Sequence, residues 1–100
     1  MQSGYQAHYN SEVQEIMNME SKYIIIQDIG IPRDDPHWNL LMYIAVYCHS
    51  KMAAEDIYKD MADFFGMECN TIKNYVSRSL KKAKFKGVKD YLERIENYGK

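Results

Sequence analysis

The fold is decided by the stretch AEDIYKDMADFFGMECNTIKNYVSRSLKKAKF, which covers residues 54–85. Its apolar side chains recur every three or four positions, so the spacing predicts one helix over residues 54–65 and a second over 71–85. Gly66 lies between them and can adopt the positive φ that ends a helix, and Ala62 is small where the two helices must approach. A short, glycine-containing connection between two helices is typical of a helix-turn-helix, although an ordinary helical hairpin meets several of the same conditions.

The pair would pack through the apolar residues Met61, Phe65, Met67, Ile72 and Tyr75. At 100° per residue, the helix over 71–85 separates into two faces. Its apolar face holds Ile72, Tyr75, Val76, Ser79, Leu80 and Ala83. Its polar face holds Asn74, Ser77, Arg78 and Lys81, flanked by Lys73 and Lys84. This second helix therefore has the layout of a recognition helix, and the simpler alternative is an amphipathic helix with solvated lysines.

Arginine and asparagine can read guanine and adenine edges, and lysines neutralise phosphates, which assigns two groups of candidates. The candidates for contact with DNA bases are Thr71, Lys73, Asn74, Ser77 and Arg78. The candidates for contact with phosphates are Lys81, Lys82, Lys84 and Lys86.

The formal net charge of −1 hides a strong segregation of charge along the chain. Residues 1–69 hold four basic and eleven acidic side chains, and residues 70–89 hold seven basic side chains and no acidic one. Solvated helix faces normally mix both signs, because opposite charges one turn apart attract each other. The acid-free run therefore favours an anionic partner for the helix over 71–85.

The remaining periodicity predicts helices on both sides of this pair. One begins at Asn10 or Ser11 and stops at Gly30, with a break at Ser21 as the alternative. Another is capped by Asp35, with Pro36 in its first turn, and ends near Ser50. A last helix covers about residues 89–98.

The chain of 100 residues, 46% of them hydrophobic, accommodates one core, so we expect an all-α, compact bundle of about five helices. We expect residues 1–10 to be loose and residues 11–100 to form a single domain. The longest apolar run, Leu40 to Cys48, has nine residues and is too short for a membrane span, and the N-terminus has no signal-peptide pattern. A cytoplasmic protein is therefore expected, with its two cysteines reduced.

No residue pattern supports catalysis, a cofactor or a small-molecule substrate. The histidines, His8, His37 and His49, have no metal-ligand spacing, and the adjacent Cys48 and His49 would point about 100° apart on a helix. There is no glycine-rich phosphate loop. Nine tyrosines could stack on single-stranded RNA bases, but most of them fall at core spacing. We therefore expect neither an enzyme nor a metalloprotein.

These residues resemble a family, the C-terminal DNA-binding domain of the master response regulator of sporulation initiation in endospore-forming bacteria. The similarity runs from about Tyr23 to Gly87 and includes the turn of residues 29–32, the apolar span of residues 40–46 and the stretch of residues 57–65. The resemblance implies an all-helical domain whose fourth helix enters the major groove of double-stranded DNA. It also implies that a second copy of the domain pairs with it on an adjacent half-site.

The chain departs from this family at the recognition helix. Where the family commonly has Ser-Arg-Val-Glu-Arg, residues 70–74 here are Asn-Thr-Ile-Lys-Asn, so only the apolar position is kept and the operator sequence cannot be transferred. The family domain also continues beyond the equivalent of Lys100, and this chain has no room for a receiver domain. Control by aspartyl phosphorylation within the chain is therefore not expected.

Two hypotheses remain. The first is a small transcriptional regulator that binds double-stranded DNA with the helix over 71–85. The alternative is a protein-interaction module in which this basic helix docks on an acidic partner. In that case the aromatic helix predicted between Asp35 and about Ser50 forms a homodimer or complex.

Overall fold

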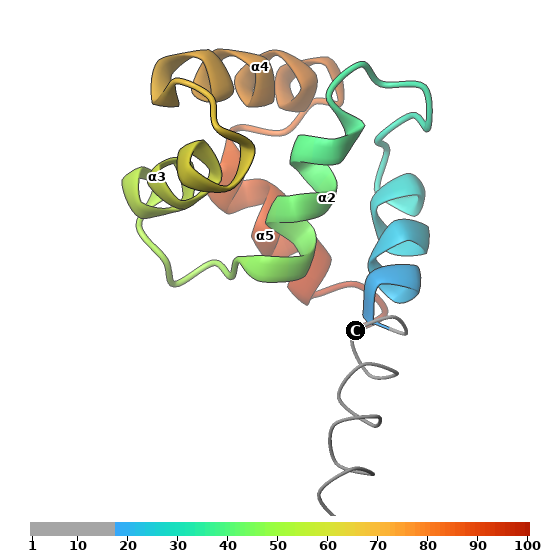
Figure 1. The fold of residues 1–100 in the computed structure, drawn as a ribbon. Coiled ribbons are helices and arrows are strands. Elements are labelled where there is room, and N and C mark those ends of the chain that lie inside the picture. Colours follow the sequence, from blue (N-terminus) through green and yellow to red (C-terminus); the bar gives the residue numbers. More distant parts are fainter. Residues whose placement is uncertain (1–17) are drawn as a thin grey trace, which may run out of the picture.

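The computed structural model describes residues 18–100, and within this range the regular secondary structure is all helical, as predicted (Figure 1). The first helical stretch occupies residues 18–28 and continues through Ser21 without the break considered above. The predicted start of this helix and the predicted loose segment 1–10 lie outside the described residues. The other helices are α2 (Trp38–Tyr47), α3 (Ala54–Phe65), α4 (Cys69–Lys82) and α5 (Val88–Glu96).

One hydrophobic core draws side chains from every described helix. Its fully buried members include Ile26, Leu41, Met61, Ile72 and Tyr91. The Tyr91 hydroxyl donates a hydrogen bond to the carbonyl oxygen of Leu41 at 3.0 Å, so the one polar atom of this large side chain has a partner inside the core. Burial also raises the pKa of Tyr91, which keeps the hydroxyl protonated as a donor. The core thereby ties α5 to α2.

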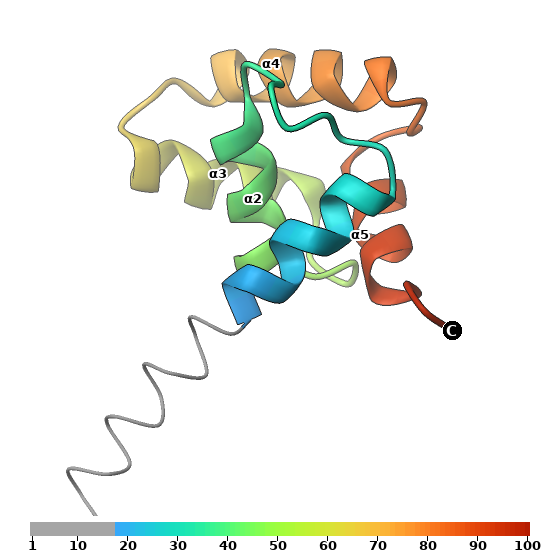
Figure 2. The same cartoon turned by 90° about the vertical axis from the view of Figure 1, so that its right-hand side faces the viewer.

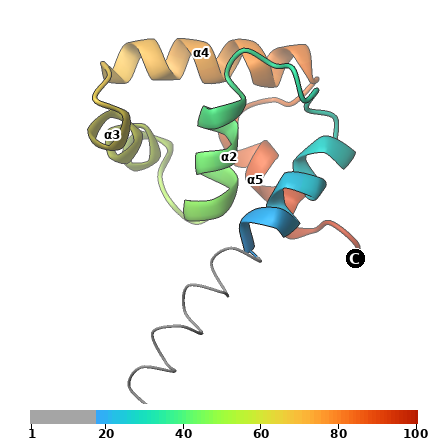
Figure 3. The ribbon, with the colours of Figure 1, turned by 45° about the vertical axis from the view of Figure 1, so that its right-hand side comes forward.

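The predicted pair of helices is present, and its connection is shorter than expected. Only residues 66–68 separate α3 from α4. Gly66 has φ +63° and ψ +37°, the left-handed conformation predicted for it, and the Met67 amide donates to the Ala62 carbonyl at 3.2 Å. Figure 3 shows α3 end-on while α4 runs across the top of the molecule. The DNA-binding role of this arrangement stays a prediction.

The predicted end of the fourth helix is wrong. α4 covers Cys69–Lys82 rather than 71–85, because Lys84 adopts the left-handed conformation at φ +70°. The Phe85 amide then donates to the Leu80 carbonyl at 2.8 Å, which closes a Schellman turn. Phe85 itself is 4% exposed and contacts Tyr91 edge-on, so burial of its ring turns the chain away from the helix axis.

The boundaries of α2 and α5 also differ from prediction. α2 begins at Trp38 rather than Pro36, because Asp35 instead stabilises a preceding turn through its side chain and its carbonyl. It ends at Tyr47, where Cys48 becomes extended, rather than near Ser50. α5 runs over Val88–Glu96 instead of 89–98, and Tyr98 lies in a terminal turn. Figure 2 shows the helix over 18–28 next to α5, and the Tyr98 hydroxyl reaches back to donate to Asp28.

Candidate nucleic-acid interface

α4 forms the upper edge of the described structure, with α2, α3 and α5 beneath it (Figures 1 and 3). Its inner side is buried through Ile72, Val76, Ser79 and Leu80. Its outer side carries the exposed side chains Lys73, Asn74, Arg78, Lys81 and Lys82. The division of α4 into two faces therefore agrees with the periodicity of the sequence, including the burial of Ser79.

The predicted contact residues do not all lie on this outer side. Among the base-contact candidates, Thr71 and Ser77 are half-buried, whereas the other three are exposed. Among the phosphate-contact candidates, Lys84 and Lys86 are exposed but lie beyond the end of α4. The backbone amide of Lys86 donates to Asp90 Oδ2 at 2.9 Å, which binds this segment to α5. Of the four predicted phosphate-contact lysines, two therefore lie on α4 and two follow it.

The C-terminal half of α4 is attached to the segment that precedes α2. Figure 3 shows this segment passing beside that half of the helix. Asp35 is 7% exposed, and its Oδ1 accepts hydrogen bonds from the Ser79 hydroxyl and from the His37 amide, each at 2.8 Å. A buried carboxylate needs such donors, since an unpaired buried charge is strongly unfavourable. Asp35 therefore fixes the position of His37 relative to α4.

The sequence did not reveal this connection, because a helix cap alone accounts for Asp35 there. The signal that could have found it was Ser79, a hydroxyl on the apolar face of a predicted helix. A buried hydroxyl requires a partner, and a nearby buried carboxylate supplies one. Nothing local in the sequence selects Asp35 as that partner, since the two residues are 44 positions apart.

A polar pocket lies between α4 and the segment that precedes α2. The imidazole of His37 stacks on the Tyr75 ring, with centroids 4.2 Å apart and planes 9° from parallel. Beside the stack lies a depression lined by Asp35, Pro36, His37, Arg78, Ser79 and Lys82. Two permanent cations one helical turn apart and a histidine therefore share one concave surface.

The N-terminal half of α4 has a different surrounding. Lys73 lines one pocket with Glu55 and Asp56 from the first turn of α3. On its other side it lines a second pocket, which also holds two acids of α5, Asp90 and Glu93, and two lysines, Lys86 and Lys89. Acidic side chains thus flank the early turns of α4, although residues 70–89 contain none themselves.

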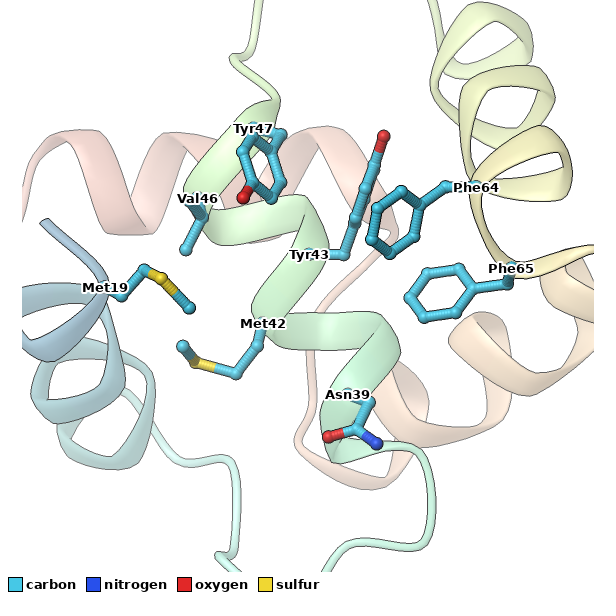
Figure 4. A pocket seen from close by; sticks show the side chains of 8 residues that line it. All are labelled: Met19, Asn39, Met42, Tyr43, Val46, Tyr47, Phe64 and Phe65. Carbon is cyan, nitrogen blue, oxygen red and sulfur yellow. The ribbon is translucent and has the colours of Figure 1, made fainter. Parts of the chain in front are cut away.

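A second surface, between the helix over 18–28, α2 and the end of α3, is apolar. Figure 4 shows Met19 and Met42 on one side of this groove and the rings of Tyr43, Tyr47, Phe64 and Phe65 on the other. Phe64 is 64% exposed and Tyr47 51%, yet Phe64 lies only 4.8 Å from the Tyr43 ring. The lining of this groove is mainly apolar.

The surroundings of Glu96 and Cys48 account for the shifted pKa of each group. Glu96 accepts two hydrogen bonds from Ser50, at 2.8 Å from the amide and 2.6 Å from the hydroxyl, and these bonds lower the pKa of its carboxyl. Burial, with a smaller contribution from Asp60, raises the pKa of the Cys48 thiol to about 11. Cys48 is therefore a thiol rather than a thiolate at neutral pH.

The described residues contain neither a cluster of metal ligands nor a helix suited to a membrane. Between residues 18 and 100, no three histidine, cysteine, aspartate or glutamate side chains gather where they could hold a metal ion. No helix in that same range is both long and apolar enough to cross a membrane. His8 lies outside the described residues, so its predicted lack of a metal partner is untested.

Comparison with known proteins gives no relative. No protein-family model, no curated protein and no solved structure matches this chain.

Proposed function

We propose that this chain is a cytoplasmic, sequence-specific binding domain for double-stranded DNA that acts as a small transcriptional regulator. The observation that carries the proposal is the outer side of α4, on which five hydrogen-bonding or cationic side chains project from a helix at the edge of the molecule. An α-helix of this kind fits the major groove of B-DNA. Cationic side chains on the same helix provide the phosphate contacts that dominate affinity.

The proposed roles divide along the helix. The residues proposed to contact or approach bases are Thr71, Lys73, Asn74, Ser77 and Arg78. Lys81 and Lys82 would bind phosphates from the last turn of α4, and Lys84 and Lys86 from the segment that follows. Thr71 and Ser77 are half-buried, so they have less room to reach a base. Asn74 and Arg78 have longer, exposed side chains and are the stronger candidates for direct base contact.

The proposal is tested by fluorescence anisotropy of the full chain with a labelled pool of random duplexes, titrated from about 50 to 200 mM salt. We expect saturable binding that weakens steeply with salt, and enrichment of a sequence motif when tight binders are selected. The double variant Lys81→Gln/Lys82→Gln should lower the slope of log K against log[salt] by about 1.8. Lys51→Gln, an exposed lysine in the loop between α2 and α3, is the matched control and should leave the slope unchanged.

Absence of binding at the lowest salt would overturn the proposal. It would favour the alternative, in which α4 docks on an acidic protein. If binding occurs, the stoichiometry on the selected sequence, measured by sedimentation velocity, tests the second part of the proposal. Two copies per site, with half-sites about one helical turn apart, are expected for a pair of helix-turn-helix domains.

A further inference from the structure

The pocket between α4 and the segment before α2 has features that a helix surface alone lacks. Arg78 and Lys82 stand one turn apart, and His37 reaches the same depression from a different part of the chain. Three nitrogen-bearing side chains that converge from two elements can surround one ligand, whereas lysines along a single helix face contact separate ligands. Their convergence indicates a site for a small anionic group.

The fixed position of His37 is the second feature. The imidazole is held by its face against Tyr75, and its backbone is held by Asp35, which is itself bonded to Ser79 of α4. A protein side chain that is already held in position loses little conformational freedom when a ligand binds to it. The pocket therefore requires no rearrangement of His37 to meet an anion.

The charge balance of the pocket also favours an anion. The groups that face His37 are Asp35 from its own segment and Tyr75, Arg78 and Lys82 from α4. Asp35 is the one acidic member, and it is buried with its Oδ1 engaged by two donors. Arg78 and Lys82 are exposed, so their positive charges dominate the mouth of the pocket.

We propose that this pocket binds one phosphate of the DNA backbone, with His37 as a phosphate-contact residue beside Arg78 and Lys82. This inference rests on the proposed function, because it extends the DNA-binding surface from α4 to the segment that precedes α2. The ligand class is a phosphodiester, and its partners are the imidazole N–H, the guanidinium and the ammonium group. Arg78 can contribute from the pocket wall while the duplex lies along the outer side of α4.

The proposal can be tested through the pH dependence of DNA binding. Histidine is the side chain that ordinarily gains a positive charge between pH 8 and pH 6. A protonated imidazole adds one charge-assisted hydrogen bond to the phosphate and one released counterion. Binding should therefore tighten as the pH falls, and its salt slope should steepen by about 0.9.

The experiment compares the affinity of the full chain for its selected duplex at pH 8 and pH 6, with circular dichroism at both values to confirm folding. The wild type should bind about three- to tenfold more tightly at pH 6. His37→Gln should lose this gain. His49→Gln, which changes an exposed histidine after α2, is the matched control and should keep it.

A second measurement uses the wild-type protein alone. Each phosphate of the duplex is replaced in turn by a neutral methylphosphonate, and the pH 6 gain should disappear at one phosphate per bound chain. A gain that survives every replacement would overturn the proposal, as would a gain that His37→Gln retains. Failure to bind any duplex would instead overturn the proposed function itself, so the two failures are distinguishable.

A third arm separates the DNA backbone from free phosphate. Inorganic phosphate is titrated at constant ionic strength while the His37 ring protons are followed by NMR. A saturable shift with phosphate, combined with DNA binding that shows no pH gain, would assign the pocket to a small phosphate and overturn the DNA assignment. Duplex-induced shifts of the same protons that disappear with the critical methylphosphonate would support it.

Discussion

The two ends of α4 differ in their electrostatic surroundings. At the N-terminal end Lys73 lies among Glu55 and Asp56 of α3, which stand in the first turn of that helix. At the C-terminal end Arg78 and Lys82 share a pocket with His37, and the one carboxylate there is buried and hydrogen-bonded. A helix that looks uniformly basic in the sequence is therefore basic at one end and nearly balanced at the other.

The difference teaches that charge along a sequence and charge across a surface are separate quantities. Residues 70–89 contain no acid, but the fold brings acids from α3 and α5 to the first half of α4. The pocket at Arg78 and Lys82 has no exposed acid in its lining, whereas both pockets at Lys73 do. Four changes break or sharpen this contrast.

Asp35→Ala breaks the C-terminal end and should have the largest effect. It removes the acceptor for the Ser79 hydroxyl and the His37 amide and leaves that hydroxyl buried without its partner. We expect the free energy of unfolding to fall by about 2–4 kcal/mol, measured by urea denaturation. Ser79→Ala should cost less, and the double variant should cost less than the sum of the two, since both lose the same bond. Additive losses would contradict this coupling.

Arg78→Ala tests the role of the arginine in the C-terminal half of α4. If Arg78 reads a base, the change should cost about 1–3 kcal/mol and relax the preference at one base pair, as measured by affinity for a panel of single-substituted duplexes. Lys81→Ala should instead weaken binding to every duplex alike. Equal losses on all duplexes for both variants would exclude a base-reading role and leave Arg78 as a phosphate contact only.

Lys84→Gly separates backbone strain from charge just beyond α4. Lys84 has φ +70°, which glycine adopts without a Cβ clash, so the glycine variant should be more stable by about 0.5–1 kcal/mol in thermal unfolding. It should also bind DNA more weakly, because a phosphate-contact candidate is lost. Lys84→Gln is the matched control and should weaken binding without the gain in stability. A glycine variant no more stable than wild type would show that the conformation is not strained.

Glu55→Gln combined with Asp56→Asn sharpens the contrast at the N-terminal end and should have the smallest effect. Removing two exposed negative charges near Lys73 should strengthen DNA binding by about 0.2–1 kcal/mol at low salt, and the gain should fade as salt is added. Glu20→Gln, an exposed acid on the helix over 18–28, tests whether the gain is specific to the first turn of α3. An equal gain from that single change would point to net charge alone.

Much of the fold could be predicted because its signals are local. The bounds of α3 and the role of Gly66 follow from helical periodicity and from the conformational freedom of glycine. The outer side of α4 follows from the angle of 100° per residue, which placed Ser79 inside and Arg78 outside. These features depend on neighbours within a few positions.

The rest depends on partners that are distant in the sequence. α4 ends at Lys82 because Phe85 is buried against Tyr91. The left-handed residue there is Lys84 rather than a glycine, so the sequence does not indicate the turn. Likewise, the pocket at His37 exists because Asp35 meets Ser79, and the acids beside Lys73 arrive from another helix. Helical periodicity does not predict contacts between residues that are distant in the sequence. The candidate site was therefore predicted as one uniform face of a helix, without the difference between the two ends of α4.

The hydrogen bond between Asp35 and Ser79 has a consequence for how the chain folds. It joins residues 44 positions apart, so it forms only after the segment containing α2, α3 and most of α4 has closed into a loop. Closing such a loop costs conformational entropy, so we expect the bond to form after the rate-limiting step of folding. Loss of the bond should accordingly appear as faster unfolding, with the folding rate nearly unchanged.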